Sequence, residues 1–267
     1  MVIIMKIISV GTLKGGTGKS MMAFNLAGAL AEEKKVLLMD VDPQCNLSNN
    51  VGINIAQQDT YTIKDIFDNP NIDPDKLTVR HPIEPLENLD IIPGHIQLTA
   101  TELLLSSKPA RERILEYYIE DNRDYFEQYD YIIIDTNPSM GLVNQNAFCA
   151  SDSIILVSDI DDNSRIGLEL FIYLWEEVRK ALRKKDNVKA LLINKLDVRT
   201  NLSSDMLEYI GSDSDLSKLM ISQPVRSRVA FPKAAMQRLP VTLYKGAEQS
   251  AEEIRNVVKE LYEREVF

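Results

Sequence analysis

Ten residues near the start of the chain place glycines and a lysine at the spacing of a phosphate-binding loop. Residues 11–20 read GTLKGGTGKS, which fits G-x-x-x-x-G-K-[ST] with Gly11 or a residue near it opening the loop. In such a loop, backbone N–H groups point at phosphate oxygens, the lysine bridges the β- and γ-phosphates, and the hydroxyl binds Mg²⁺. Lys19 and Ser20 take the last two roles here. The remaining nucleotide contacts are predicted at Gly15, Gly16, Thr17, Gly18 and Met21.

Three aspartates stand directly after apolar runs that have the composition of buried strands. Asp40 and Asp42 follow residues 36–39 (VLLM), and Asp135 follows residues 131–134 (YIII). Parallel sheets place their sites at the carboxyl ends of the strands, so we expect these side chains near the phosphate loop. An apolar strand that ends in aspartate is a Walker B pattern, which predicts that Asp135 holds Mg²⁺ through water.

The apolar runs alternate with segments of helical periodicity along the chain. Strands are predicted at residues 6–11, 36–39, 89–92, 131–134, 154–157 and 190–193, with a further one at 219–222. Helices are predicted at about residues 20–31, 109–128, 165–184, 203–210 and 247–264. Continuous apolar strands are typical of a sheet covered on both faces. The sequence therefore predicts an α/β fold with a doubly wound, mostly parallel sheet, the P-loop NTPase fold.

A single P-loop ATPase domain is expected over residues 1–267. A hydrophobic content of 45% over 267 residues is sufficient for one large core. Residues 54–88 are the least regular part of the chain, and we interpret them as an insertion on the same domain. About 13 residues precede Lys14, too few for an amino-terminal helix-turn-helix domain.

The charge balance argues against a protein that binds nucleic acid with its whole surface. Thirty basic residues stand against 40 acidic ones, which gives a net charge of −10. No segment is long and apolar enough to span a bilayer. Cys45 and Cys149 lack the spacing of metal ligands, so we expect two free thiols in a reducing cytosol.

Lys14 gives the loop a more specific character, because K-G-G-T-G-K-S is the deviant Walker A pattern. The second motif, VLLMDVDPQ at residues 36–44, and the DTNPS stretch that begins at Asp135 add to it. With these motifs the chain resembles the ParA/MinD family of ATPases from about residue 6 to 260, and most of all the short, Soj-like ParA proteins. The resemblance implies that ATP and Mg²⁺ are the cofactors and that Lys14 reaches the nucleotide of a partner subunit. It also implies that Asp42 positions the attacking water and that Asp40 organises the outer shell of the metal.

The residues of the predicted base pocket are compatible with two nucleotides, GTP and ATP. Residues 194–197 read NKLD, the tetrad with which small GTPases recognise guanine, whereas the rest of the chain favours adenine. By resemblance, Asn194 contacts adenine and the stretch around Pro224 walls the ring.

Two stretches depart from the family pattern. Asn137 replaces a proline in the segment after Asp135, which puts the rigidity of that segment in doubt but not the metal role. The family often has V-P after the next strand, where this chain has Val157, Ser158 and then three aspartates, Asp159, Asp161 and Asp162. A solvated loop is the interpretation we favour for these acidic residues.

One segment of this acidic chain has a positive net charge. Residues 179–199 hold eight basic and two acidic side chains, a net charge of +6. The segment is either a solvated helix end, where basic residues favour the helix dipole, or a nonspecific DNA-binding face. The DNA contacts would then come from Arg183, Lys184, Lys185, Arg226 and Arg228.

The resemblance implies a ParA-type ATPase that hydrolyses ATP slowly and segregates a plasmid, mobile element or chromosome. It would form a homodimer with ATP, bind DNA nonspecifically and be stimulated by a ParB-like centromere-binding protein, in the cytoplasm on the nucleoid. One alternative is a positioning ATPase for a protein complex without a DNA role, and another is a metabolic phosphate-transfer enzyme, against which Lys14 argues. No membrane partner is expected, because the last helix is net acidic and its apolar stripe suits the core.

Overall fold

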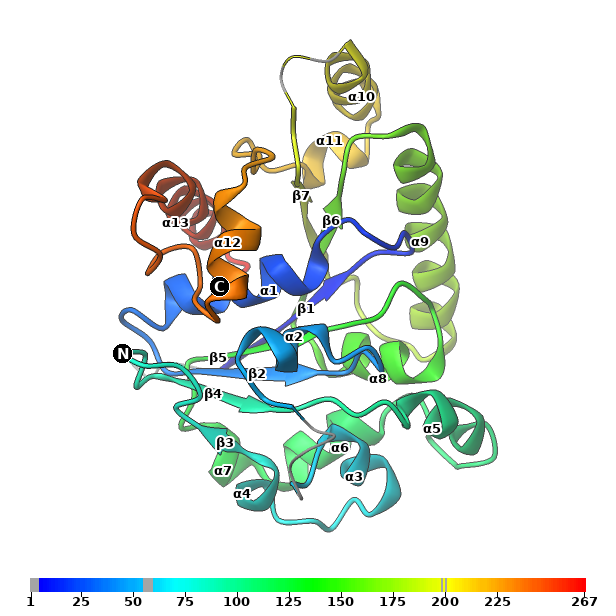
Figure 1. Ribbon diagram of the computed structural model, residues 1–267. Helices are drawn as coiled ribbons and strands as arrows, with labels where there is room; N and C mark the ends of the chain where they lie inside the picture. The colour runs from blue at the N-terminus through cyan, green and yellow to red at the C-terminus, as the bar shows by residue number, and fades with distance from the viewer. Residues whose placement is uncertain (1–4, 55–59, 198, 200) are drawn as a thin grey trace.

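A central sheet of seven strands runs through the molecule (Figure 1). The computed structural model describes residues 5–54, 60–197, 199 and 201–267. The strands are β1 (Lys6–Gly11), β2 (Val36–Asp40), β3 (Val79–Arg80), β4 (Leu89–Ile92), β5 (Tyr131–Asp135), β6 (Ser153–Ser158) and β7 (Val188–Ile193). Their order is β3-β4-β2-β5-β1-β6-β7, and every neighbouring pair is parallel except β3 with β4. The predicted doubly wound, mostly parallel sheet is confirmed.

Successive side chains of each inner strand enter opposite layers of the core. In β2, Val36 and Leu38 join one buried cluster, whereas Leu37 and Met39 join another. β5 alternates in the same way. This period of two explains the continuous apolar runs, because both faces of the sheet are covered by helices.

Helices of both chain ends cover the first face of the sheet. In Figure 1, α12 and α13 lie on the same side as α1. The helices of this layer are α1 (Lys19–Leu30), α2 (Asn46–Asn50), α12 (Ala230–Met236) and α13 (Glu248–Glu263). α13 buries Ile254, Val257, Val258 and Leu261 in the core, as its apolar stripe predicted. Among the described residues no helix has the length and apolar character needed to cross a bilayer.

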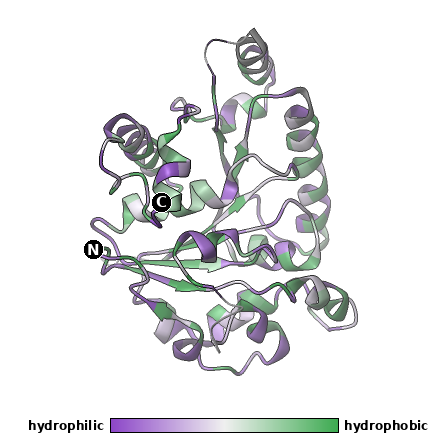
Figure 2. Cartoon of the chain, in the orientation of Figure 1, coloured by the Kyte–Doolittle hydropathy of each residue, from purple (hydrophilic) through white to green (hydrophobic). Residues whose placement is uncertain are grey.

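The middle of the chain supplies the helices of the second face. Around β4, β2 and β5 they are α3 (Ile63–Asp68), α4 (Pro74–Leu77), α5 (Leu98–Leu105), α6 (Ile114–Asp121), α7 (Arg123–Phe126) and α8 (Leu142–Ala150). Beside β6 and β7 they are α9 (Asp162–Ala181), α10 (Asn201–Ser212) and α11 (Leu216–Leu219). Figure 2 shows hydrophobic residues along the inner strands and hydrophilic ones concentrated on outer turns and helix faces.

Three predicted elements differ in the structure. Residues 219–222 form no strand, because only Met220 makes a single bridge to Leu191. The helix predicted at residues 109–128 is broken into α6 and α7 at Asn122, whose side chain bonds back to the Tyr118 carbonyl. The segment at 54–88 contains α3, α4 and the antiparallel edge strand β3, and its residues 55–59 lie outside the described part of the chain.

Candidate functional site

The phosphate loop joins the end of β1 to the start of α1. Gly16 and Gly18 have φ angles of 82° and 90°, a left-handed conformation that favours glycine. Gly18 is the residue before the first turn of α1, so the helix N-terminus faces the loop. Gly11 is the last residue of β1, and the residue five positions before Gly18 is Leu13. Leu13, a residue near Gly11, therefore stands at the opening position of the motif in place of its usual glycine.

Two residues from the end of β7 hold the loop in place. The Asn194 amide nitrogen donates to the Thr17 carbonyl over 2.8 Å, and the Lys195 ammonium donates to the Gly16 carbonyl. Asn194 is 1% exposed, and a Cβ at Gly18 would lie 2.4 Å from its amide nitrogen. The shape of the loop therefore depends on a segment 177 residues away in the sequence.

Lys19 presents a buried positive charge at the loop. Its side chain is enclosed, and no described carboxylate lies within ion-pair distance of the ammonium. Burial lowers the pKa of Lys19, while the charges of Asp135 and Asp42 oppose that shift. An unpaired buried ammonium beside two carboxylates is suited to an anion such as the β- and γ-phosphates.

Asp135 has the features of a residue that contacts a bound cation. It is fully buried at the end of β5, and neither carboxylate oxygen has a hydrogen-bond partner in the described structure. Burial raises the pKa of Asp135 well above its usual value, and Asp40 adds to that shift. The Ser20 hydroxyl is close enough to lower the pKa of Asp135, but it does not reach hydrogen-bond geometry. A divalent cation between Ser20 and Asp135 would compensate the negative charge of the Asp135 carboxylate.

The donor set fits Mg²⁺ bound with a nucleotide rather than by protein ligands alone. In the described ranges, no three carboxylate, histidine or cysteine side chains come together as a metal site. Mg²⁺ typically takes one or two protein ligands and completes its shell with water and phosphate oxygens. The buried Thr17 hydroxyl also lacks a partner, as expected of a residue that lines a phosphate site.

Asp40 organises the loop that carries Asp42. Its buried carboxylate accepts bonds from the Ser48 N–H and hydroxyl and from the Asp42 N–H. Ser48 in turn accepts from the Gly94 N–H at the end of β4. Burial raises the pKa of Asp40 to about 6. Asp40 thus fixes the backbone that carries Asp42. The sequence had predicted for Asp40 only the role of organising the outer shell of the metal.

Asp42 faces Lys19 from the adjacent loop. It is 5% exposed, and one carboxylate oxygen accepts from the Gln44 N–H over 2.8 Å. Burial raises the pKa of Asp42, while the Gln44 bond and the charge of Lys19 oppose the shift. The second oxygen has no described hydrogen bond, so it is available to a water molecule.

The segment after Asp135 is fixed by an amide network. The Asn144 amide nitrogen donates to the carbonyls of Asn137 and Ser139, over 2.8 and 2.7 Å. The Asn137 N–H donates to Asn144 in return, a bond that a proline could not make. The network supplies the rigidity that the proline-to-asparagine change had put in doubt. Glu102 of α5 holds the same region by accepting from the N–H groups of Leu142 and Val143.

The side chain of Lys14 bonds to residues of its own chain. Its ammonium bonds Asp159 over 2.8 Å, Asp161, and the Ser164 hydroxyl over 3.0 Å. Burial lowers the pKa of Lys14, but hydrogen bonds and charges from the two aspartates outweigh it and the pKa is raised. Asp159 and Asp161 are therefore lysine partners and not a solvated loop, while the side chain of Asp162 lies outside the described residues.

The predicted base-pocket residues lie together at the end of β7. Leu196 pairs with Arg226, and the Leu196 N–H donates to the Val225 carbonyl, so the Pro224 stretch runs beside Asn194. The amide nitrogen of Asn194 is engaged by the loop. Asp197, the guanine-reading position of the tetrad, is bonded to Arg199 through both carboxylate oxygens.

The predicted basic face is divided in the structure. Arg183, Lys184 and Lys185 precede β7, whereas Arg226 and Arg228 lie beside its far end. A six-residue strand spans about 20 Å, so the two groups lie at opposite ends of β7, about that far apart. Lys184 bonds Glu116 and the Cys149 carbonyl. Arg226 and Arg228 both bond the buried Glu253, over 3.2 and 3.1 Å.

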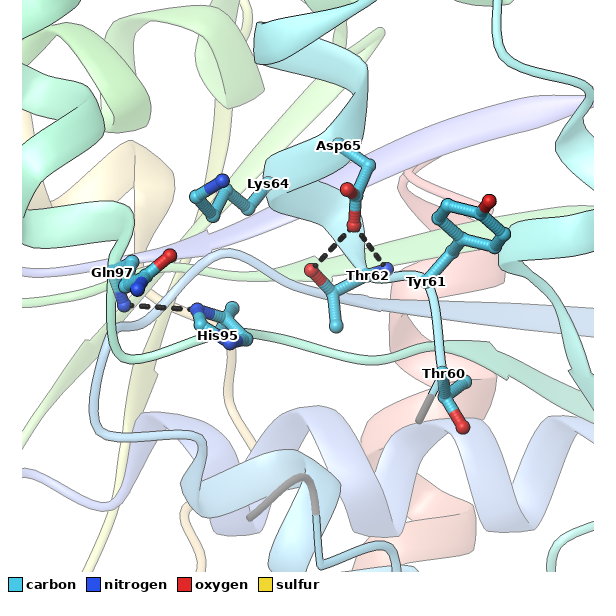
Figure 3. A pocket seen from close by; sticks show the side chains of 7 residues that line it. All are labelled: Thr60, Tyr61, Thr62, Lys64, Asp65, His95 and Gln97. Carbon is cyan, nitrogen blue, oxygen red and sulfur yellow. Dashed lines mark hydrogen bonds between the residues drawn. The ribbon is translucent and has the colours of Figure 1, made fainter. Parts of the chain in front are cut away.

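A polar cavity of about 360 Å³ lies near the end of β4 (Figure 3). Thr62 donates to Asp65 through both its N–H and its hydroxyl, and the Gln97 N–H donates to His95. Two pairs of lining residues thus bond to each other, and none of the lining residues comes from the phosphate loop. Sequence reasoning also missed Ser48, Glu102, Asn144 and Lys195, which support the site. Only Lys195 carried a signal, because it is the second residue of the NKLD tetrad.

Comparisons with known proteins agree with this geometry. Residues 5–190 match the AAA domain family. The sporulation initiation inhibitor protein Soj of Bacillus subtilis is 33% identical over 96% of this chain and 98% of its own length. Two solved structures share the fold: apo McdA from Cyanothece (TM-score 0.85, 19% identity, 97% of this chain and 100% of that one) and a Borrelia burgdorferi plasmid partition protein bound to AMPPNP (0.78, 22%, 98% and 100%). The chain belongs to the ParA/Soj family of P-loop ATPases, which implies that it binds ATP.

Proposed function

We propose that this protein is a ParA-type ATPase that dimerises with ATP, binds DNA without sequence preference and segregates a plasmid, mobile element or chromosome. Hydrolysis is slow and is stimulated by a ParB-like partner. The observation that carries the proposal is the position of Lys14, which starts the phosphate loop but whose ammonium bonds Asp159 and Asp161 and no group of the loop itself. A lysine there has no role in a single subunit beyond its contacts with Asp159, Asp161 and Ser164.

Each residue around the loop has a defined part in the proposed reaction. Lys19 and the N–H groups from Gly15 to Ser20 hold the β- and γ-phosphates. Ser20 and Asp135 would hold Mg²⁺, which supplies positive charge to the phosphate oxygens. Asp42 orients a water molecule toward the γ-phosphate with its free carboxylate oxygen, and Asp40 fixes the Asp42 backbone.

The Lys14→Ala variant tests the proposal. It should bind ATP with nearly parental affinity, because Lys14 makes no bond inside the loop beyond the turn to Thr12. It should fail to form the ATP-dependent dimer, because its target is the nucleotide of the partner subunit. Light scattering with a slowly hydrolysed ATP analogue measures the dimer, and a separate titration measures nucleotide binding. A normal dimer in this variant would refute the role of Lys14 across the interface.

A second function has one observation in its favour. Three of the five basic residues assigned to DNA are ion-paired, Lys184 with Glu116 and both arginines with Glu253, and the five are split between the two ends of β7. This arrangement supports a positioning ATPase whose cargo is a protein complex. Retention on DNA with ATP but not with ADP separates the two functions, because the positioning ATPase needs no DNA contact.

A further inference from the structure

The Lys14 ammonium uses all its hydrogen-bond donors on residues of its own subunit. The side chain donates to Asp159, Asp161 and Ser164, which matches the three N–H donors of a lysine. Its stem also lies against the first turns of α9, where a Cβ at Gly167 would be 3.7 Å from Lys14 Cβ. A lysine with all three donors engaged has to break these bonds before it can reach any other anion.

The three partners are themselves held in place. Asp159 follows the last residue of β6, and Asp161 is the N-cap of α9. One oxygen of Asp161 accepts from the Ser164 N–H over 2.9 Å, and the other accepts from Lys14. The buried Ser164 hydroxyl bonds Asp159 as well. The receptor for Lys14 is thus built from a strand end and a helix N-terminus and has little freedom to follow the lysine outward.

We propose that Asp159, Asp161 and Ser164 form a cis latch that holds Lys14 on its own subunit and thereby sets the threshold for the ATP-dependent dimer. The inference rests on the proposed function, because it needs the dimer in which Lys14 crosses to the partner. Two conformations of Lys14 then compete, one bonded to the latch and one bonded to the nucleotide of the partner. Any weakening of the latch shifts the population toward the second conformation.

The ion pairs set the scale of the effect. The side chain of Lys14 is 21% exposed, and those of Asp159 and Asp161 are 20% and 39% exposed. Partly exposed ion pairs contribute modestly because water screens them. Removing both negative charges should therefore shift the dimerisation midpoint by about tenfold rather than by many orders of magnitude.

The Asp159→Asn/Asp161→Asn variant tests the latch by light scattering against protein concentration, with a slowly hydrolysed ATP analogue. Asparagine keeps the N-cap acceptor that α9 needs, so the fold should persist, as the melting temperature and nucleotide affinity will verify. The dimer should form at an about tenfold lower protein concentration than in the parent. The matched control, Glu177→Gln/Asp186→Asn, removes two negative charges on and just after the same helix, away from Lys14, and should leave the midpoint unchanged.

The outcomes distinguish the latch from the proposed function. If the parent forms no dimer at any concentration, the proposed function fails and the latch falls with it. If the parent dimerises and the double variant has the same midpoint, only the latch is refuted. A weaker dimer would mean that the two aspartates serve the interface and would also refute it. Acylation of the Lys14 amine gives an independent measure, because the rate should rise in the double variant and an unchanged rate contradicts a closed latch.

Discussion

The Asn194 amide nitrogen lies too close to Gly18 to leave ordinary contact distance for a Cβ at that position. A Cβ at Gly18 would be 2.4 Å from that nitrogen, which donates to the Thr17 carbonyl over 2.8 Å. The residues after β7 therefore clamp the phosphate loop, and a side chain at position 18 would strain the backbone and displace Asn194.

Gly18→Ala should weaken nucleotide binding. The substitution strains a residue with a φ of 90° and displaces Asn194, which disturbs the N–H groups aimed at the phosphates. Strain of this kind costs about 1–3 kcal/mol, so the affinity for ATP should fall roughly 10- to 100-fold. Titration with a fluorescent ATP analogue measures the loss. The control is Gly211→Ala in α10, outside the loop, whose Cβ would meet nothing within 4 Å, and it should bind as the parent does. Equal affinities for all three proteins would contradict the clamp.

Asp135→Asn should stabilise the nucleotide-free protein and remove its response to Mg²⁺. Among the described residues the buried carboxylate has no hydrogen-bond partner, and replacing its charge relieves about 1–3 kcal/mol, or about 2–6 °C in melting temperature. Burial raises the pKa of Asp135 above its unfolded value, so the folded state favours the protonated form. The penalty is absent below the unfolded pKa and grows as the pH rises through the folded pKa.

The melting difference between Asp135→Asn and the parent should accordingly be larger at pH 7 than at pH 4. Thermal scans at several pH values, without nucleotide, measure it. Adding Mg²⁺ and ATP should stabilise the parent more than the variant, because the parent alone gains the metal contact. A variant that melts below the parent at neutral pH would mean that the carboxylate has a stabilising partner, contrary to its assignment as a metal contact.

The sequence predicted the strands and the loop because both depend on local patterns. Six of the seven predicted strands formed, all but residues 219–222, and the residues at the ends of β1, β2 and β5 converge as parallel topology requires. Helix α8 was missed because Asn144 and Asn146, which are completely buried, interrupt its apolar periodicity. Their amides satisfy backbone groups of the Asn137 segment and of Arg111, long-range roles that no periodicity reveals.

The basic segment at residues 179–199 shows that a charge count cannot tell which side chains are ion-paired in the folded protein. A count of charges along residues 179–199 treats every lysine and arginine as available, yet the fold brings Glu116, 68 residues earlier, to Lys184. The acidic stretch at Asp159 and Asp161 was interpreted as solvated for the same reason, because its partner Lys14 lies 145 residues earlier in the chain. Ion pairs between distant segments are decided by the tertiary fold.

Asp42→Ala should bind ATP and dimerise but hardly hydrolyse it. The free carboxylate oxygen is the one assigned to the attacking water, and removing a group of this kind lowers the rate about 10²- to 10⁴-fold. Asp42→Asn is the companion variant, because the amide oxygen keeps the bond from the Gln44 N–H while the charge is lost. Phosphate release in single-turnover experiments measures the step. Parental rates in both variants would remove Asp42 from the mechanism.

Arg183 and Lys185 are the basic residues that remain for DNA. Both are exposed, and among the described residues no carboxylate lies within ion-pair distance of either. In a two-fold dimer their charges are doubled, and each neutralised phosphate contributes about −0.9 to the slope of log K against log salt. The ATP-bound dimer should therefore bind duplex DNA of any sequence, weakly and with strong salt dependence.

Arg183→Glu/Lys185→Glu should abolish retention on DNA while ATPase activity and dimerisation persist. The control with the same change of net charge is Lys245→Glu/Lys259→Glu, two exposed lysines near and on α13, and it should retain DNA. If the first variant binds DNA normally, Arg226→Gln tests the basic residues beside the other end of β7. Glutamine avoids placing a second carboxylate beside Glu253. Failure of the parent to bind DNA in any nucleotide state would exclude the partition function. The protein-positioning function would then be the one to pursue, because it requires the ATP-dependent dimer but no contact with phosphates.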